Sequence, residues 1–270
     1  MRSTNVTPGN QSNSETTGSR SLRGVYPAAN TLEGAGVPIK RALPTRDGRY
    51  DPVDPFLLLD DVELQVTGGP SFPPHPHRGF EIITYLLSGG MTHEDSEGHR
   101  ATVGPLGLQH ILTGSGMWHG EEHDHSQGTM RGLQMWINLA RSEKSREPAY
   151  TAVNGPDVPV ERVGHATIRK LAGDGGAVSL VTPAIYYDVT IDPSATENFP
   201  IADGWQGFVY VLSGLGSFGN PAETVGDGEI GILGPTGGLS VIAGTSGVRF
   251  MLGAGQPLRE PIRWRGPYVD

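Results

Sequence analysis

Short apolar segments separated by glycine and proline run through most of this chain, and within them apolar and polar positions often alternate. Successive side chains of an extended strand point to opposite faces, so this alternation predicts β-strands. Forty glycines and 22 prolines among 270 residues leave little room for long helices. We therefore expect an all-β fold with strands at the spacing of a sandwich or barrel. The expected strands are 55–59, 81–88, 109–113, 132–139, 185–191, 208–213, 230–233 and 248–252.

One of these strand patterns occurs twice. The segment EIITYLLSGG, residues 81–90, matches QGFVYVLSGL, residues 206–215, at a constant offset of 125 residues (206 − 81). This repeat predicts two copies of one β-domain. A charged segment that ends in proline, residues 141–148, is typical of a linker, so we place the boundary near residue 150. The expected parts are a disordered tail rich in Ser, Thr, Asn and Gly (1–22), a first barrel (23–150) and a second barrel (151–270).

The histidines are concentrated in the first copy. Eight of the nine lie between residues 75 and 125, and the ninth is His165. At the constant offset, Pro200 and Ala202 stand where the first copy has His75 and His77, and Gln206 matches Glu81. We therefore expect the second barrel to lack metal ligands.

Two pairs of polar residues in the first copy have the same one-residue gap. His75 and His77 lie in PPHPHRGFE, and His119 and Glu121 lie in MWHGE. In an extended strand each pair shares one face. Either pair alone could be polar surface. On two strands that point into one barrel, however, they would bring three imidazoles and one carboxylate together, which predicts a metal site.

The donor set restricts which metal could bind. The chain has no cysteine, so thiolate sites, disulfides and iron–sulfur clusters are excluded. Calcium and magnesium prefer oxygen ligands, and zinc would close a tetrahedron with these four residues. Six-coordinate iron(II), nickel, cobalt or manganese would keep two positions open for chemistry. We expect iron(II), with nickel, cobalt, manganese and copper as alternatives.

These segments resemble the pirin family of the cupin superfamily, whose members are bicupins. The resemblance spans about residue 23 to the C-terminus and is carried by HPHRGFE (75–81), YLLSGG (85–90), HED (93–95) with GH (98–99), MWHGE (117–121), GLQMWINL (132–139), FVYVLSG (208–214), and EPI (260–262) near GPY (266–268). It implies two tandem jelly-roll-type cupin barrels. It also implies a metal in the N-terminal barrel, held by His75, His77, His119 and Glu121.

Glu81 is the carboxylate that most cupins would use as a ligand. Pirins take the carboxylate from the later motif, and Glu121 stands in that place. We therefore expect Glu81 to lie behind the ligands, where it either accepts an N–H from a ligand histidine or pairs with Arg78.

The remaining histidines carry weaker expectations. His93 and His99 flank the acidic turn EDSE, which is typical of a solvated hairpin rather than a second metal site. His110 replaces the larger aromatic residue that the resemblance leads us to expect, which alters the expected pocket lining. His123 and His125 are expected in a polar surface loop. The aromatic residues expected in the core or the pocket wall are Phe80, Trp118 and Trp136.

Net charge and hydropathy limit the kinds of partner that the protein could bind. A net charge of −9 and a pI near 5.4 argue against direct binding to nucleic acid or to anionic membranes. The apolar runs are far shorter than the roughly 20 residues that a membrane span needs. The first two dozen residues lack the apolar core of a secretory signal, so we expect a cytoplasmic protein.

The resemblance implies a dioxygenase of the quercetinase type, which uses O2 to cleave the central ring of a flavonol and releases carbon monoxide. Glu121 would take the hydroxyl proton of the substrate. The alternative is a non-enzymatic, redox-sensing regulatory protein that acts through protein contacts. A metal-free storage or isomerase cupin would have no reason to keep all four ligands.

Overall fold

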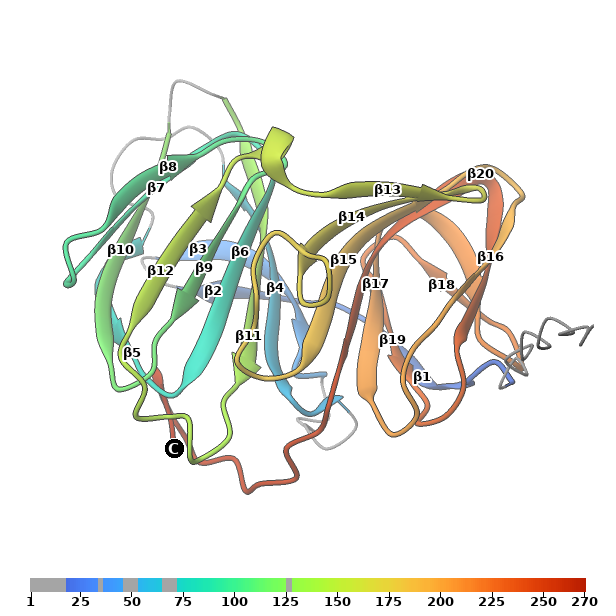
Figure 1. The fold of residues 1–270 in the computed structure, drawn as a ribbon. Helices are drawn as coiled ribbons and strands as arrows, with labels where there is room; N and C mark the ends of the chain where they lie inside the picture. Colours follow the sequence, from blue (N-terminus) through green and yellow to red (C-terminus); the bar gives the residue numbers. More distant parts are fainter. Residues whose placement is uncertain (1–17, 34–35, 46–52, 65–71, 125–127) are drawn as a thin grey trace, which may run out of the picture.

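The computed structural model describes residues 18–33, 36–45, 53–64, 72–124 and 128–270, which form two β-barrels packed side by side (Figure 1). All eight expected strands are confirmed in position, and the all-β bicupin fold is confirmed with them. Helical structure in the described residues is limited to short pieces such as the 3-10 turn η3 (Gly155–Asp157). No helix in this part of the chain is long and apolar enough to cross a membrane.

The first barrel is built from two sheets. The larger has the spatial order β12 (Ala149–Val153), β9 (Leu108–Leu112), β6 (Phe80–Ser88), β11 (Met130–Asn138), β4 (Phe56–Leu64), β3 (Val37–Leu43) and β2 (Ala29–Glu33). The smaller has the order β5 (Phe72–His77), β10 (Met117–His123), β7 (Met91–Asp95) and β8 (Arg100–Val103). The smaller sheet carries both histidine motifs.

The second barrel is formed by one continuous sheet whose longest strands bend from one wall to the other. Its order is β1 (Leu22–Pro27), β19 (Glu229–Leu233), β17 (Gln206–Phe218), β20 (Leu239–Gly255), β15 (Ala184–Ile191), β14 (Ala166–Ala172) and β13 (Val160–Val163). Two further strands pair with the long ones, β16 (Thr196–Phe199) with β20 and β18 (Glu223–Gly226) with β17. The chain ends in a two-stranded hairpin, β21 (Trp264–Arg265) and β22 (Tyr268–Val269).

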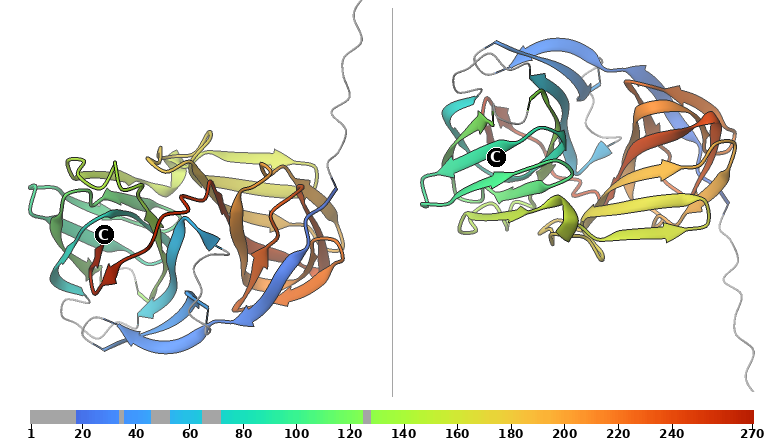
Figure 2. Two further views of the ribbon diagram at one scale, coloured as in Figure 1. Left: turned by 90° about the horizontal axis from the view of Figure 1, so that it is seen from below. Right: turned by 90° about the horizontal axis from the view of Figure 1, so that it is seen from above.

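The two large sheets have the same strand order, but the ends of the chain cross between the barrels. β12 lies at the edge of the first sheet beside β9, and β1 takes the equivalent place beside β19 in the second sheet. The segment after β20 returns to the first barrel, where the C-terminus lies (Figures 1 and 2). The predicted boundary near residue 150 falls within β12, a strand of the first sheet. β1, which we expected in the first barrel, pairs with the second sheet, and the C-terminal hairpin reaches the first barrel through a bridge between Arg78 and Tyr268.

The two barrels share a core where their large sheets face each other. On β6, Ile83 and Tyr85 belong to this shared core, whereas Ile82 faces the interior of the first barrel. β17 alternates in the same way, with Tyr210 in the shared core and Val209 inside the second barrel. Both faces of these strands are buried, which explains why they read as nearly continuous apolar runs.

Reciprocal hydrogen bonds connect the barrels within this shared core. Tyr85 donates its hydroxyl to Asp188 of the second barrel at 2.7 Å, and Tyr210 donates to Asp61 of the first at 3.0 Å. Arg249 pairs with Asp188 at 2.6 Å, and Arg131 pairs with Asp61 at 2.7 Å. The repeat noticed in the sequence therefore places equivalent tyrosines at equivalent positions of the interface.

The expectation of a disordered tail over residues 1–22 is wrong for its last part, while residues 1–17 lie outside the described residues. Arg20 is 2% exposed and donates to the main-chain carbonyls of Gly237 at 2.7 Å and Gly234 at 3.0 Å. A guanidinium has five N–H donors, so a ring of carbonyls can hold it without a carboxylate. Polar composition alone did not reveal this fit.

The match of His75 and His77 to Pro200 and Ala202 is also wrong. β16 occupies the place of β5 and ends at Phe199. The loop between β16 and β17 is longer than the loop between β5 and β6. The constant offset of 125 residues, which matches β6 to β17, therefore does not hold for the strands that precede them.

Strand pairing identifies the true equivalents. His119 of β10 lies opposite His75 of β5, and Val241 of β20 lies opposite Glu197 of β16. By the same ladders, Phe199 takes the place of His77. The histidines of the first barrel are therefore matched by other residue types in the second.

Candidate metal centre

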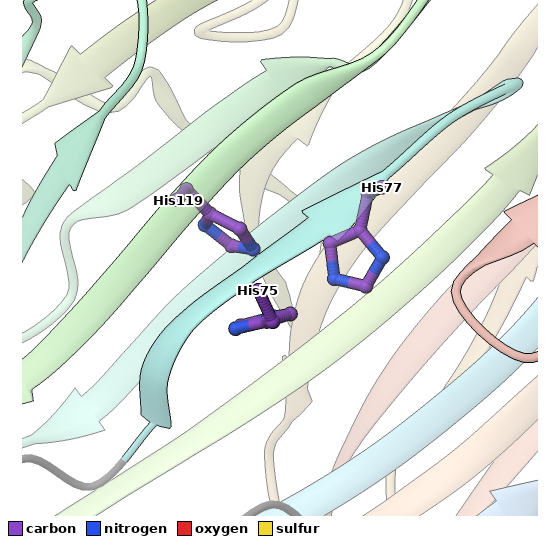
Figure 3. A group of neighbouring side chains, drawn as sticks. All are labelled: His75, His77 and His119. Atoms are coloured by element: carbon purple, nitrogen blue, oxygen red, sulfur yellow. The ribbon is translucent and has the colours of Figure 1, made fainter.

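The two histidine motifs lie on neighbouring antiparallel strands. His119 on β10 is directly opposite His75 on β5, and His77 follows two residues later on the same face. The ring centroids of His75 and His119 are 4.4 Å apart, and those of His77 and His119 are 5.1 Å apart. One ligand nitrogen from each ring lies within 4.8 Å of the others, and the three rings point toward one another (Figure 3).

The outer nitrogen of each of these rings already has a partner. His75 Nδ1 lies 2.8 Å from the carbonyl of Pro73, and His77 Nδ1 lies 3.3 Å from the carbonyl of Pro267. A carbonyl can only accept, so Nδ1 carries the proton and the lone pair is on Nε2. His119 Nδ1 lies 3.4 Å from His93 Nδ1. All three rings can therefore present Nε2 to one shared point.

The inner nitrogen of His119 shows that this point suits a metal ion. His119 Nε2 is buried and has no hydrogen-bond partner among the described residues. Leaving a buried polar atom unpaired is costly, and a metal ion would satisfy it. Three neutral imidazoles and a carboxylate fit a divalent transition metal.

The electrostatic surroundings keep these imidazoles neutral. Burial, with a smaller contribution from His75, lowers the pKa of His77 to about 3. Burial and the neighbouring histidines also hold the pKa of His119 well below its usual value. At neutral pH both rings are therefore unprotonated, which metal binding requires.

Glu121 stands on the same face of β10 as His119, two residues further along. Its carboxylate belongs to a second group, with His93 and His119, whose ligand atoms also lie within 4.8 Å of one another. Gln109 on β9 donates a hydrogen bond to it. Burial raises the pKa of Glu121 to about 7, although the bond from Gln109 acts in the opposite direction. The structure thus brings the three histidines together and connects Glu121 to them through His119.

A cavity of about 890 Å³ opens beside this cluster. His75, His77 and Glu121 lie in its wall, and most of the remaining lining is apolar. Trp264 of the C-terminal hairpin stacks on Trp136 with ring centroids 5.4 Å apart. The apolar residues that line the cavity include Leu58, Phe72, Met91, Met130, Trp136 and Trp264. A cavity of this size and character can hold a small organic molecule.

The C-terminal segment forms part of this site. Pro267 bonds His77 through its carbonyl, which also accepts the main-chain N–H of Arg78 at 3.3 Å. Arg78 pairs in turn with Asp270. Lys144 donates to the carbonyls of Gly79 and of Val269, so the turn after β5 and the last strand are tied together. The final residues thus help to hold a candidate ligand in place, a contact that the sequence analysis missed.

The expectation that His93 belongs to a solvated hairpin is wrong. His93 is fully buried on β7, opposite Glu121 of β10. Its Nε2 lies 3.1 Å from Asp95, and its ring stacks on Tyr150 with centroids 4.1 Å apart. The one-residue gap between His93 and Asp95 was the available signal, because it puts both side chains on one strand face. His99, by contrast, has a side chain that is 42% exposed.

The expectation that Glu81 bonds a ligand histidine or Arg78 is wrong. Glu81 is fully buried, but its carboxylate bonds His110 at 3.0 Å and the main-chain N–H groups of Val181 and Thr182. Its neighbours Phe80 and Ile82 belong to the cluster inside the first barrel, so strand alternation turns Glu81 to the opposite face. It therefore connects the barrels and stays outside the histidine cluster, and His110 bonds it instead of lining the cavity.

Three further expectations can be compared with the structure. The expectation that His123 lies in a surface loop is wrong, because this residue ends β10 and is 2% exposed. His125 lies outside the described residues. Trp118 is 56% exposed, contrary to expectation, because alternation along β10 turns it outward when His119 points inward. Phe80 and Trp136 are buried, as expected.

Comparison with known sequences decides the family. The family described as "Pirin" matches residues 36–137, and "Pirin C-terminal cupin domain" matches residues 186–270. The chain belongs to the pirin family. The sequence resemblance is thereby confirmed, as are the bicupin architecture and the N- and C-terminal cupin domains.

Several pirins and related structures match most of the chain. A pirin-like protein of Solanum lycopersicum is 38% identical over 245 residues, covering 88% of this chain and 82% of that protein. Human pirin is 36% identical, covering 88% and 83%. A solved structure of quercetin 2,3-dioxygenase from Acinetobacter baumannii superposes with a TM-score of 0.83 at 26% identity, covering 93% of this chain and 91% of that one.

Proposed function

We propose that this pirin is a metal-dependent dioxygenase that cleaves a flavonol or a related aromatic enol with O2. The proposal is supported by the position of the histidine cluster next to an apolar cavity. Three imidazoles whose ligand nitrogens lie within 4.8 Å of one another stand in, or directly beside, the wall of an apolar cavity of about 890 Å³. The structural neighbour named quercetin 2,3-dioxygenase supports the same substrate class.

The proposed ligands are His75, His77, His119 and Glu121. A divalent metal, with iron(II) expected and nickel, cobalt, manganese or copper as alternatives, would supply Lewis acidity and access to O2 when bound. The stacked rings of Trp136 and Trp264 would hold a flat aromatic substrate and exclude water from it.

Glu121 is the proposed base. Its carboxylate is buried, and burial raises its pKa to about 7. In the metal-free protein, burial thus gives this carboxylate a raised affinity for a proton, as a general base requires. Glu121 would therefore accept the proton of the substrate's enolic hydroxyl as the substrate enters, while Gln109 holds the carboxylate in position.

The test measures turnover with each metal separately. Protein loaded with iron, nickel, cobalt, manganese or copper is mixed with quercetin, and O2 uptake and the flavonol absorbance are followed. We expect a shifted flavonol band on binding and loss of that band as O2 is consumed. Glu121→Gln should keep much of the metal, since an amide oxygen can still coordinate, but lose most of the rate.

His165→Gln is the matched control, because its side chain is 66% exposed in the second barrel. It should leave the rate unchanged. If no metal supports flavonol binding or O2 uptake, the dioxygenase proposal fails, and a regulatory role through protein contacts becomes the better one. Full activity in Glu121→Gln would remove Glu121 from the role of base.

A further inference from the structure

The second group of candidate ligands, which includes His93, raises the question of what this buried histidine does. It stands between the proposed ligand His119 and the carboxylate of Asp95. His93 and the side chain of Asp95 are fully buried. The contact is therefore shielded from solvent, and its hydrogen bonds are worth more than they would be at the surface.

Asp95, His93 and His119 form a hydrogen-bonded row, and the donor and acceptor of each bond follow from the carboxylate at its end. Asp95 is an acceptor when ionised, so His93 Nε2 must carry the proton that it donates. A neutral ring then has its lone pair on Nδ1. That atom lies 3.4 Å from His119 Nδ1, which must act as the donor. His119 is thereby left with its lone pair on Nε2, the buried nitrogen for which the described part of the chain offers no hydrogen-bond partner.

Asp95 is itself held in position. Its Oδ1 accepts the main-chain N–H groups of Glu97 and His99, each at 3.0 Å, and its Oδ2 also lies 2.9 Å from the ring of His99. These bonds come from the turn between β7 and β8. The sequence segment that resembled a solvated acidic hairpin therefore anchors the row.

Tyr150 of β12 supports the row from the side. Its ring stacks on His93 with an interplanar angle of 7°, and its hydroxyl donates to Gln109 at 3.2 Å. Gln109 in turn donates to Glu121. The two candidate ligands of β10 are thus each held by a hydrogen-bonded residue, and the stacked pair connects the two supports.

We propose that His93 is a positioning residue, which together with Asp95 fixes the orientation and tautomer of His119 so that its Nε2 faces the metal. The inference rests on the proposed metal site and adds a residue that acts on it from behind. His93 does not coordinate the metal, because one of its nitrogens bonds Asp95 and the other faces His119 Nδ1. Such outer partners commonly change metal affinity by about 10- to 100-fold.

The test compares Co(II) binding by variants of the full chain, measured by competition with a chelator. His93→Phe keeps a ring to stack on Tyr150 but removes the acceptor, and it should weaken Co(II) binding about 10- to 100-fold. His93→Asn can place an amide oxygen near the position of Nδ1, so it should restore most of the affinity. This rescue would not follow from a merely structural role.

A second variant addresses Asp95 without changing its shape. Asp95→Asn can donate to His93 Nε2, which would reverse the proton along the row and set two N–H groups against each other. It should therefore weaken Co(II) binding as His93→Phe does. Glu94→Gln is the matched control, because its exposed side chain on the same strand carries an equal charge and should change affinity less than twofold.

X-ray absorption at the cobalt edge supplies the second measurement. The number of coordinated imidazoles should be three in the wild type and in every His93 variant. Unchanged affinity in both His93→Phe and Asp95→Asn would overturn the inference, as would the loss of one imidazole in His93→Phe, which would make His93 a ligand. Wild-type protein that binds no Co(II) would instead overturn the metal site itself, so the two failures are distinguishable.

Discussion

In the first barrel, β10 turns His119 and Glu121 inward, whereas the matching stretch of β20 turns Val241 and Ala243 inward. The two strands pair with equivalent neighbours in the same order. The first interior keeps polar groups and a cavity, while the second is packed with apolar side chains, including the edge-to-face pair Phe218 and Phe250. One scaffold can therefore serve chemistry in one copy and stability in the other.

The interface between the barrels shows the opposite behaviour, because both copies contribute to it alike. Tyr85 and Tyr210 occupy equivalent strands, and each donates to a buried aspartate of the other barrel. The two aspartates are 5% and 4% exposed by side chain, and each pairs with an arginine. The repeat thus preserves the contact surface even where the interiors have diverged.

The largest expected effect is a difference in metal binding between the interiors of the two barrels. His119→Ala should abolish most of the bound metal, because it removes the ring that connects the other histidines to Glu121. Val241→Ala, at the equivalent place in the second barrel, should leave metal content unchanged in the folded fraction. Elemental analysis of both purified variants checks this, and equal metal content would contradict the contrast.

The next effect concerns packing in the second barrel. Phe250 is fully buried between Phe199 and Phe218. Phe250→Ala should lower the free energy of unfolding by about 3–5 kcal/mol, through lost burial and the cavity left behind. Urea denaturation measures this, with Leu32→Ala as an exposed control. A loss below about 1 kcal/mol would show that the second interior is not the tightly packed one.

A smaller effect tests the symmetry of the interface. Tyr85→Phe and Tyr210→Phe each remove one buried hydrogen bond to a carboxylate, so each should cost about 1–2 kcal/mol of unfolding free energy. Chemical denaturation of the two single variants gives the comparison. Costs that differ by more than about twofold would mean that the two copies of the contact are not equivalent.

The smallest effect lies where the C-terminal segment meets the first barrel. Burial lowers the pKa of Lys144 to about 8, below its usual 10.5. Between these values the unfolded chain binds more protons than the folded one, so this residue makes stability rise as pH increases from 8 to 10.5. We expect a gain on the order of 1 kcal/mol after allowing for partial exposure.

Urea denaturation of the wild type and of Lys144→Met across that range measures this gain. The methionine has no titrating amine, so the free energy of unfolding of the wild type should rise from pH 8 to 10.5 relative to that of the variant. Parallel pH profiles for the two proteins would show that the folded pKa is not lowered.

Local patterns in the sequence were sufficient for the strands and for three of the residues that cluster. The one-residue gaps within 75–77 and 119–121 place each pair on one strand face, because alternation is a property of the backbone itself. The eight expected strands lie where their apolar runs predicted them. Both results depend only on residues that are near one another along the chain.

What only the tertiary structure decided is which faces meet. His93 is buried because β7 pairs with β10, and Glu81 faces Val181 because the second barrel packs against β6. The placement of β1 in the second barrel and of Pro267 beside His77 depends on pairings between opposite ends of the chain. Periodicity determines the face of a strand on which a side chain lies, but the partner of that face is set by sheet closure and by packing over long sequence distances.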